Sequence, residues 1–265
     1  MFKTIVVPID GSELASRAVP VGSWLAEGFG AELHLVTMTF AADAADAEEA
    51  LRRAALHARG APTRSDVIHH SFAGPGIVDV ARTDGDALLC LSTRGSSGLH
   101  ALLLGSVSDE VVRQVDGPVV LVGPACGPIP TDAPRLLVCI DGSDTSDRIL
   151  PIAASWALEL HMEVELVLVA DAHTLTSFRT TTEAVVADAA EILRDAGVRC
   201  TARIEMSTTP ARAIVQVADE VQASVIALAT HGAGGLFAET LGHVVTEVVR
   251  HAPVPVVVLP VRDDG

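Results

Sequence analysis

Two glycine-rich clusters carry the residue types that hold phosphate groups. In the first cluster, Gly95 and Gly105 are followed by the hydroxyl residues Ser106 and Ser108. Glycines let the backbone approach a phosphate closely, and a helix that begins near Gly105 would direct free N–H groups and its positive dipole end at an anion. The serine hydroxyls add hydrogen-bond donors at the same helix start. The cluster therefore predicts an anion site that needs no lysine.

The second cluster has the same spacing and different side chains. Gly232 and Gly242 repeat the glycine pair, whereas His243 and Val245 replace the two serines. Two hydroxyl donors are lost by this exchange. A neutral histidine still donates one hydrogen bond, and a protonated one attracts phosphate. We expect weaker or pH-dependent anion binding at this second cluster.

An Asp-Gly-Ser sequence follows an apolar run near the start of each half of the chain, at Asp10 and Asp141. Ligands of open parallel sheets bind beyond the carboxyl ends of the strands, so this is a place for a ligand contact. Asp and Ser are also preferred at helix N-termini, and capping of the next helix is the alternative role. Val36 and Val169 follow the second apolar run of each half and belong to the same edge.

Basic side chains near the two clusters have open roles. Arg94 is the nearest basic residue to the first cluster, and His231 holds the matching place in the second. Arg94 either contacts a phosphate or forms a surface salt bridge, and His231 either contacts a ligand or is an exposed loop residue. The loops around Gly98 and its counterparts could also be ordinary turns that bind nothing. Repetition of the whole set in both halves favours ligand sites.

Composition limits the classes of function. The chain of 265 residues is 49% hydrophobic and 20% charged, which excludes intrinsic disorder. Its net charge of −16 argues against binding to nucleic acids or anionic membranes. Lys3 is the one lysine, and no P-loop sequence occurs. The four cysteines are widely spaced, and His69 and His70 would point to opposite faces of a strand, so no metal site is expected.

The sequence also carries information on location. No apolar run reaches the roughly 18 residues of a membrane span. The N-terminal residues lack the basic and long apolar regions of an export signal. We therefore expect a cytoplasmic protein.

The elements that position the clusters come from an internal repeat. Residues 3–27 align with residues 135–159 and keep Ile-Asp-Gly-Ser, an Arg, a Pro and a Ser-Trp pair. Residues 87–123 align in the same way with residues 224–260. A repeat of about 130 residues is a whole domain and far exceeds a solenoid unit. The chain therefore contains two copies of one domain.

Each copy alternates short β-branched runs with Ala-rich stretches of helical periodicity. This is the pattern of a parallel sheet with helices on both faces. We expect an α/β protein of two doubly wound, five-stranded, Rossmann-like domains in tandem. Domain 1 covers residues 1–124, a short and stiff Pro- and Gly-containing linker covers 125–134, and domain 2 covers 135–265.

These residues resemble the universal stress protein family in its tandem form, over nearly the whole chain. Nucleotide-binding members of that family carry G-x2-G-x9-G-[ST]; the first unit reads S-x2-G-x9-G-S from Ser92, and the second reads A-x2-G-x9-G-H from Ala229. The V-P-x-D-G-S start of the first unit and the P-V-V-x-[VL] strand that ends both units complete the resemblance. One lysine among 18 basic residues, with abundant alanine, indicates a GC-rich genome and an actinobacterial source.

The resemblance implies a site for ATP, with or without Mg²⁺, that is tighter in the first unit than in the second. Asp10 would meet the ribose or adenine, and the chain near Val36 would flank the base. The phosphates would be taken by Gly95, Gly105, Ser106, Val107 and Ser108. The rest of the nucleotide-binding set implied by the resemblance is Pro8, Arg94 and Gly98 in the first unit, and Asp141, Val169, His231, Gly232, Gly242 and His243 in the second.

The leading interpretation is a cytoplasmic, ATP-binding regulator of the stress response with little or no turnover, because no nucleophile–base pair or Walker-type lysine is recognisable. One alternative is an interaction module that has lost nucleotide binding, as the residues at Ser92, Ala229 and His243 suggest. Another is a weak ATPase or an adenylyl-transferring enzyme. The resemblance also implies an internal pseudo-dimer through the last strands, further association into a homodimer, and a protein partner that the sequence does not name.

Overall fold

The computed structural model describes residues 2–40, 44–93, 105–170, 175–230 and 242–261. The chain divides into two compact units, Met1–Pro124 and Ala125–Gly265. The segment predicted as a linker is held to the second unit, because the Gly127 N–H donates to the Pro253 carbonyl at 2.8 Å. Each unit is therefore described by itself.

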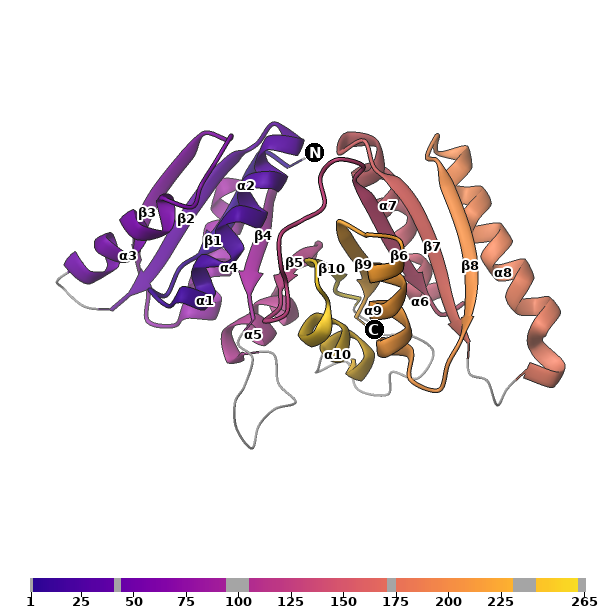
Figure 1. Ribbon diagram of the computed structural model, residues 1–265. Coiled ribbons are helices and arrows are strands. Elements are labelled where there is room, and N and C mark those ends of the chain that lie inside the picture. The colour runs from indigo at the N-terminus through magenta and orange to yellow at the C-terminus, as the bar shows by residue number, and fades with distance from the viewer. Residues whose placement is uncertain (1, 41–43, 94–104, 171–174, 231–241, 262–265) are drawn as a thin grey trace. The chain divides into compact units, whose positions relative to one another are not determined.

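The first unit alternates strands and helices along the chain (Figure 1). Its elements are β1 (Thr4–Pro8), α1 (Glu13–Ser16), α2 (Ala18–Phe29), β2 (Glu32–Thr39), α3 (Ala45–Ala55), β3 (Thr63–His69), α4 (Ala73–Asp84), β4 (Ala87–Ser92), α5 (Ser106–Gln114) and β5 (Val119–Val122). The strands lie in the order β3-β2-β1-β4-β5, and the paired strands are parallel. The predicted α/β fold is confirmed.

The second unit repeats this plan. Its elements are β6 (Arg135–Ile140), α6 (Asp144–Asp147), α7 (Ile149–Glu159), β7 (Glu163–Ala170), α8 (Leu175–Asp195), β8 (Cys200–Met206), α9 (Pro210–Glu220), β9 (Val225–Ala229), α10 (His243–His251) and β10 (Val256–Leu259). The order is β8-β7-β6-β9-β10, again with parallel pairs. The two domains of the tandem thus share one topology.

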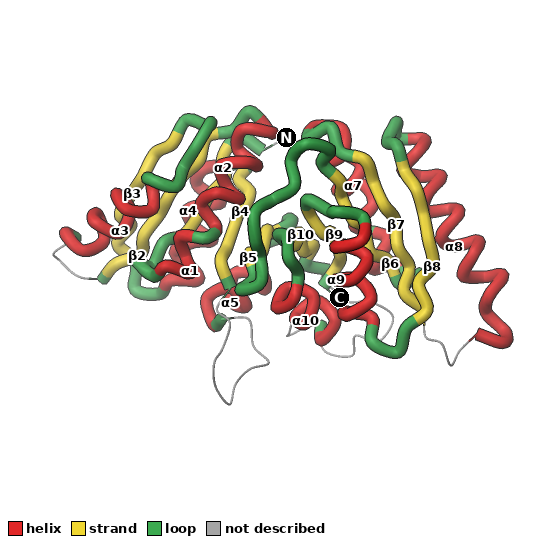
Figure 2. Tube along the Cα trace, viewed as in Figure 1, coloured by secondary structure: helices red, strands yellow, loops and turns green. Residues whose placement is uncertain are grey.

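The central strands are buried on both faces, because helices cover both sides of the sheet. Ile5, Val6 and Val7 of β1 are fully buried. Right-handed crossovers place α2 and α3 on one face of the first sheet and α4 and α5 on the other, and Figure 2 shows helices on both sides of the strands. Close packing needs Gly22 in α2, since a Cβ there would lie 2.6 Å from Val7 Cγ2.

The direction of winding changes between β1 and β4. From β1 the chain continues to β2 and then to β3, which both lie on one side of β1. It then crosses back to β4, which lies on the other side of β1. Crossing helices therefore lie on opposite faces at this point, and a crevice opens beyond the carboxyl ends of the two strands. β6 and β9 form the same switch point in the second unit.

Two element boundaries differ from the sequence-based expectation. The β-branched run of residues 66–72 predicts a strand over those residues. The structure has β3 there, and it begins at Thr63 and ends at His69. β3 is an outer strand with mostly exposed side chains, so its apolar pattern is weak and marks its ends poorly. Its hydrogen-bonded pairing with β2 sets where it begins and ends. The Ala-rich stretch of residues 183–197 predicts a helix over those residues. The structure has α8 there, which begins earlier, at Leu175, and ends at Asp195.

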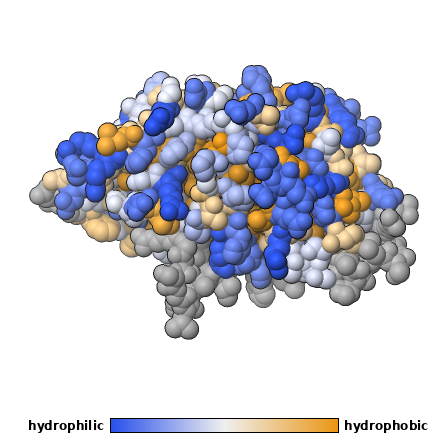
Figure 3. All heavy atoms as spheres, viewed as in Figure 1, coloured by the Kyte–Doolittle hydropathy of each residue, from blue (hydrophilic) through white to orange (hydrophobic). Residues whose placement is uncertain are grey.

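The surface is mainly hydrophilic on the face shown in Figure 3, with hydrophobic residues scattered between charged and polar ones. This agrees with the net charge of −16. Within the described part of the chain, no helix combines the length and apolar character needed to cross a membrane.

Candidate functional site

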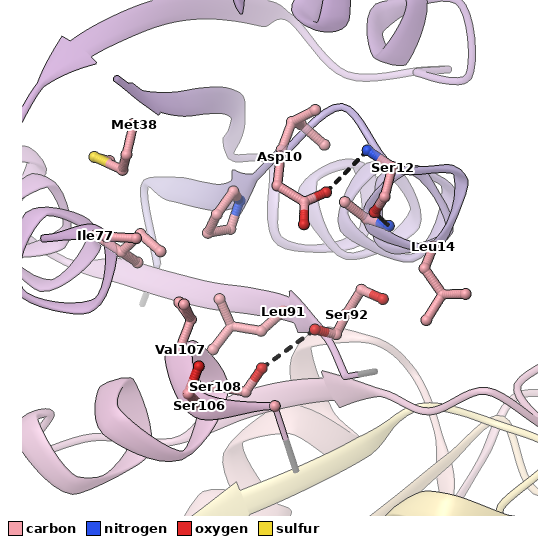
Figure 4. A pocket seen from close by; sticks show the side chains of 15 residues that line it. Asp10, Ser12, Leu14, Met38, Ile77, Leu91, Ser92, Ser106, Val107 and Ser108 are labelled. Atoms are coloured by element: carbon pink, nitrogen blue, oxygen red, sulfur yellow. Dashed lines mark hydrogen bonds between the residues drawn. The ribbon is translucent and has the colours of Figure 1, made fainter. Parts of the chain in front are cut away.

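A cavity of about 230 Å³ opens at the carboxyl edge of the first sheet. The ends of β1, β2 and β4 and the starts of α4 and α5 form its walls (Figure 4). The structure thus brings together, around one cavity, residues that the sequence places almost one hundred positions apart. The predicted site residues that line it are Pro8, Asp10, Gly105, Ser106, Val107 and Ser108.

Asp10 reaches the cavity from the turn after β1. Its Oδ1 accepts a hydrogen bond from the Ser12 N–H at 2.9 Å, and Gly11 between them adopts a φ of +81°. Ser12 caps α1, because its side chain accepts a hydrogen bond from the Ala15 N–H at 3.1 Å. The alternative in which Asp10 serves as the helix cap is therefore wrong. The exposed carboxylate of Asp10 borders the cavity instead (Figure 4).

The N-terminus of α5 forms a second wall of the cavity. Gly105 is the N-cap, and the first backbone bond of the helix runs from the Asp109 N–H to the Gly105 carbonyl at 3.0 Å. The N–H groups of the three residues between them have no partner within the helix, and the positive dipole end coincides with them. The hydroxyl of Ser106 is on an exposed residue. This wall can hold an anion by N–H groups alone.

Ser108 contributes in a different way from Ser106. It is 5% exposed, and its hydroxyl donates to the Ser92 carbonyl at 3.2 Å. Figure 4 shows this bond between the start of α5 and the end of β4. The hydroxyl hydrogen of Ser108 therefore fixes the helix to the strand, and the group that Ser108 offers to an anion is its backbone N–H.

The apolar end of the cavity consists of Met38 and Ile77. Figure 4 shows both side chains on the side away from Ser12 and Leu14. Val36, the residue predicted to flank a base, is fully buried, and Met38, two positions further on the same face of β2, reaches the cavity. The residue predicted from the sequence, Val36, comes two positions before the one that lines the cavity. The i, i+2 alternation towards the strand end indicates Met38.

The strand register also changes the matching of the two units. Pro8 pairs with Val36 in the first unit, and Cys139 pairs with Val167 in the second. Val169 therefore corresponds to Met38 and not to Val36. In the second unit a shorter β-branched side chain stands where the first has a flexible methionine.

A buried threonine directly follows β4 and β9, just before each glycine cluster in the sequence. Thr93 is 2% exposed, and its N–H donates to the Val122 carbonyl at 2.9 Å. Thr230 is 4% exposed, and its hydroxyl accepts a hydrogen bond from the Val261 N–H at 3.0 Å. Sequence reasoning missed this pair, although Thr recurs at both places. The predicted residues Arg94, Gly95, Gly98, His231 and Gly232 lie outside the described residues.

In the second unit, Gly242 takes the N-cap place before α10. A Cβ at this position would lie 2.7 Å from the Thr230 carbonyl oxygen, so only glycine fits. His243 is exposed at the first position of the helix, and Val245 is 3% exposed. Val245 thus fills the place of the buried serine of α5 without its hydroxyl.

The turn after β6 differs from the turn after β1 in its hydrogen bonds. Oδ1 of Asp141 accepts hydrogen bonds from both the N–H (3.0 Å) and the hydroxyl (2.7 Å) of Ser143. Ser143 also caps α6 by accepting from the Ser146 N–H at 3.1 Å. As in the first unit, the serine and not the aspartate is the cap. One oxygen of the Asp141 carboxylate therefore accepts two hydrogen bonds from within its own turn.

The same turn of the second unit carries more negative charge. Asp144 and Asp147 follow Asp141, whereas the matching stretch of the first unit has Glu13 and Ser16. Burial raises the pKa of the Asp147 carboxyl, and the charges of Asp141 and Asp144 raise it further. This edge of the second sheet is therefore less favourable for an anion than the first.

Comparisons with known proteins give one consistent result. The model of the universal stress protein family matches residues 1–123 and 133–260. Universal stress protein Rv2623 of Mycobacterium tuberculosis is 30% identical over 226 residues, which cover 80% of this chain and 73% of that protein. Universal stress protein Rv2005c of the same species is 34% identical over 180 residues, which cover 62% of this chain and 59% of that protein. These relatives agree with the actinobacterial composition.

Solved structures show the same fold. The crystal structure of a universal stress protein from Archaeoglobus fulgidus covers 99% of this chain and 97% of its own, with a TM-score of 0.70 and 21% identity. A putative universal stress protein from Pseudomonas aeruginosa covers 97% and 93%, with a TM-score of 0.70 and 18% identity.

Proposed function

The chain belongs to the universal stress protein family, and we propose that its first unit binds an adenine nucleotide, with ATP as the ligand. The observation that carries the proposal is the make-up of the cavity. It combines an apolar end at Met38, an exposed carboxylate at Asp10 and the N-terminus of α5. These three parts match an aromatic base, a ribose and a chain of phosphates in that order.

The phosphates would be held by geometry and not by charged side chains. The N–H groups of Ser106, Val107 and Ser108 and the dipole of α5 supply the positive potential. The hydroxyl of Ser106 adds a donor, and a flexible glycine at position 105 keeps the backbone close. With a net charge of −16, the protein repels free phosphates at long range, so such a local cradle is what binding requires.

The nucleoside would lie on the other side of the cavity. The Asp10 carboxylate accepts hydrogen bonds, and both ribose hydroxyls and the amino group of adenine donate them. Met38 and Ile77 would pack on the faces of the base. Mg²⁺, when it accompanies ATP, would be held mainly by phosphate oxygens and water, because few carboxylates are needed for such a site.

We further propose that the protein regulates the stress response through a nucleotide-dependent conformation or association, with little turnover. Backbone donors of this kind bind the ground state and the transition state about equally, which does not accelerate hydrolysis. At most, slow ATP hydrolysis is expected. The cytoplasmic location, the internal pseudo-dimer and the homodimer stay predictions.

The second unit would bind nucleotide more weakly than the first. Val245 removes a hydroxyl that fixes the helix to the strand, and the Asp141 turn carries one more carboxylate than the first unit, since Asp147 stands in the place of Ser16. His243 stands in the place of Ser106, and its neutral imidazole donates a single hydrogen bond. We therefore expect one tight site per chain at neutral pH.

Calorimetric titration of the nucleotide-stripped protein with Mg-ATP tests the proposal. The expected result is a stoichiometry of one, lost in Gly105→Val and weakened in Ser106→Ala. His243→Ala is the matched control in the second unit and should leave the site intact. The absence of both heat and a thermal shift at millimolar ATP would overturn the proposal, and an interaction module without nucleotide would take its place.

A further inference from the structure

Two exposed phenylalanine rings stand out in a chain that is poor in aromatic residues. It contains six Phe, two Trp and no Tyr. Phe2 and Phe29 pack against each other with ring centroids 5.4 Å apart. Phe40 and Phe72, by contrast, are 77% and 68% exposed. Single exposed apolar residues are common on protein surfaces, but these two lie next in sequence to elements that line the cavity.

Phe40 follows β2, the strand that carries Met38 to the apolar end of the cavity. It is the residue after the end of β2, and Met38, two positions before it, lines the cavity. Alternate residues of a strand share one face, and continuing β2 by one residue would place Phe40 on the Met38 side. The His70 N–H donates to the Thr39 carbonyl at 3.1 Å, which extends the pairing of β2 and β3 to this point.

Phe72 is the N-cap residue of α4 and directly precedes Ala73, which lines the cavity. Nδ1 of His70 lies 2.6 Å from the Phe72 carbonyl oxygen and 3.1 Å from its nitrogen, so the backbone at Phe72 is held in place. His70 and Met38 both pack against Gly76, where a Cβ would lie 2.9 Å from His70 Cγ and 2.8 Å from Met38 Sδ.

We infer that Phe40 and Phe72, which we call the aromatic rim, stack on the base of the bound nucleotide where it emerges from the Met38 end of the cavity. This inference rests on the proposed function and adds the residues that recognise the base. The cavity, at about 230 Å³, is smaller than the roughly 300–1,000 Å³ of ligand sites, so a nucleotide extends past its opening. The ring that emerges there meets apolar side chains.

The aromatic rim belongs to the first unit alone. The place of Phe72 is taken in the second unit by Thr209, which is exposed at the start of α9. The cavity, the serines of α5 and the rim therefore occur in the same unit. Stacking depends on the flat face that every base has, so the rim selects for a nucleobase and not for adenine over guanine.

Titration with three ligands separates the rim from the phosphate site. Phe40→Ala and Phe72→Ala should each weaken the binding of Mg-ATP and Mg-GTP by at least about fivefold, the low end of what one stacked ring contributes. Binding of inorganic tripolyphosphate, which has no base, should stay unchanged. Phe72→Tyr keeps a ring and should bind ATP as the wild type does.

Leu56→Ala is the matched control, because Leu56 is also highly exposed (79%) but follows α3, a helix that contributes no residue to the cavity lining. It should leave all three affinities unchanged. ATP affinities of both alanine variants within twofold of wild type would overturn the rim and leave the proposed function standing. Equal losses for ATP and tripolyphosphate would also overturn it, since they indicate a structural role. A wild type that binds no ATP would overturn both.

Discussion

A negative charge at the start of α5 should act on stability and on ligand binding in opposite directions. Ser106 is the exposed first residue of this helix. An aspartate there interacts favourably with the helix dipole by about 0.3–1 kcal/mol. Asp109, three residues on, repels it by about 0.2–0.5 kcal/mol, although Asp109 is itself paired with Arg113 at 2.5 Å. Ser106→Asp should therefore leave Tm unchanged or raise it by up to about 3 °C.

The same charge would lie where we propose that the phosphates bind. Two unit charges 4 Å apart repel each other by about 4 kcal/mol at the effective dielectric constant of a protein surface. Loss of the Ser106 hydroxyl adds about 0.5–1.5 kcal/mol. Salt screens part of the repulsion. An affinity loss of at least about 100-fold for Mg-ATP follows, because each 1.4 kcal/mol is a factor of ten.

Differential scanning calorimetry without nucleotide and isothermal titration with Mg-ATP measure the two effects. Ser106→Asn is the uncharged control of the same size, and it should bind ATP within about tenfold of wild type. A charged variant that melts normally and binds ATP within threefold of wild type would refute the placement of phosphates at α5. A large drop in its Tm would refute the reading of the helix start as an open N-terminus.

Two further predictions concern stability. Burial by itself raises the pKa of Asp84, but hydrogen bonds, led by the one from Arg64, lower it below the ordinary 3.8. Asp84→Asn should therefore lower the free energy of unfolding, measured in urea at pH 7, by about 1.5–3 kcal/mol. The difference from wild type should shrink as the pH falls below about 3.8, because the Asp84 carboxylate of the wild type is then protonated. Gly22→Ala should destabilise the protein by about 1–3 kcal/mol because the new Cβ meets Val7, whereas Gly28→Ala at an exposed place in the same helix should stabilise it in thermal melts.

Much of the fold could be predicted because it is written in local patterns that occur twice. Apolar runs such as residues 4–9 and 135–140 match β1 and β6 to within a residue. Parallel strands buried on both faces need such runs, so composition alone marks them. The outer strand β3 is mostly exposed and carries no such mark. Its bounds depend on hydrogen bonds to β2, which the sequence does not display.

The candidate site was predictable in its parts and not in its contacts. The spacing of Gly105 and Ser106 indicates a helix start, and the structure places both residues at the cavity. Met38 lines the cavity and Val36 does not, because β2 continues to Thr39. The sequence does not fix the end of this strand to within two residues. The bond from the Ser108 hydroxyl to the Ser92 carbonyl joins two elements that only the folded chain brings together.

The two units keep the same residue types at several places that support the fold and differ at the helix starts that follow the glycine clusters. Thr93 and Thr230 keep the same buried place at the end of a strand, and Ser12 and Ser143 both cap the first short helix of their unit. These residues are the same in both units because each unit needs them to fold. The first residues of the matching helices differ, since α5 begins with Ser106 and α10 with His243. A duplicated domain can change the side chains around a helix N-terminus without losing its fold, because packing and not a ligand maintains the helix. Tighter nucleotide binding in the second unit should therefore require a change in charge at the Asp141 turn as well as new hydroxyl groups at α10.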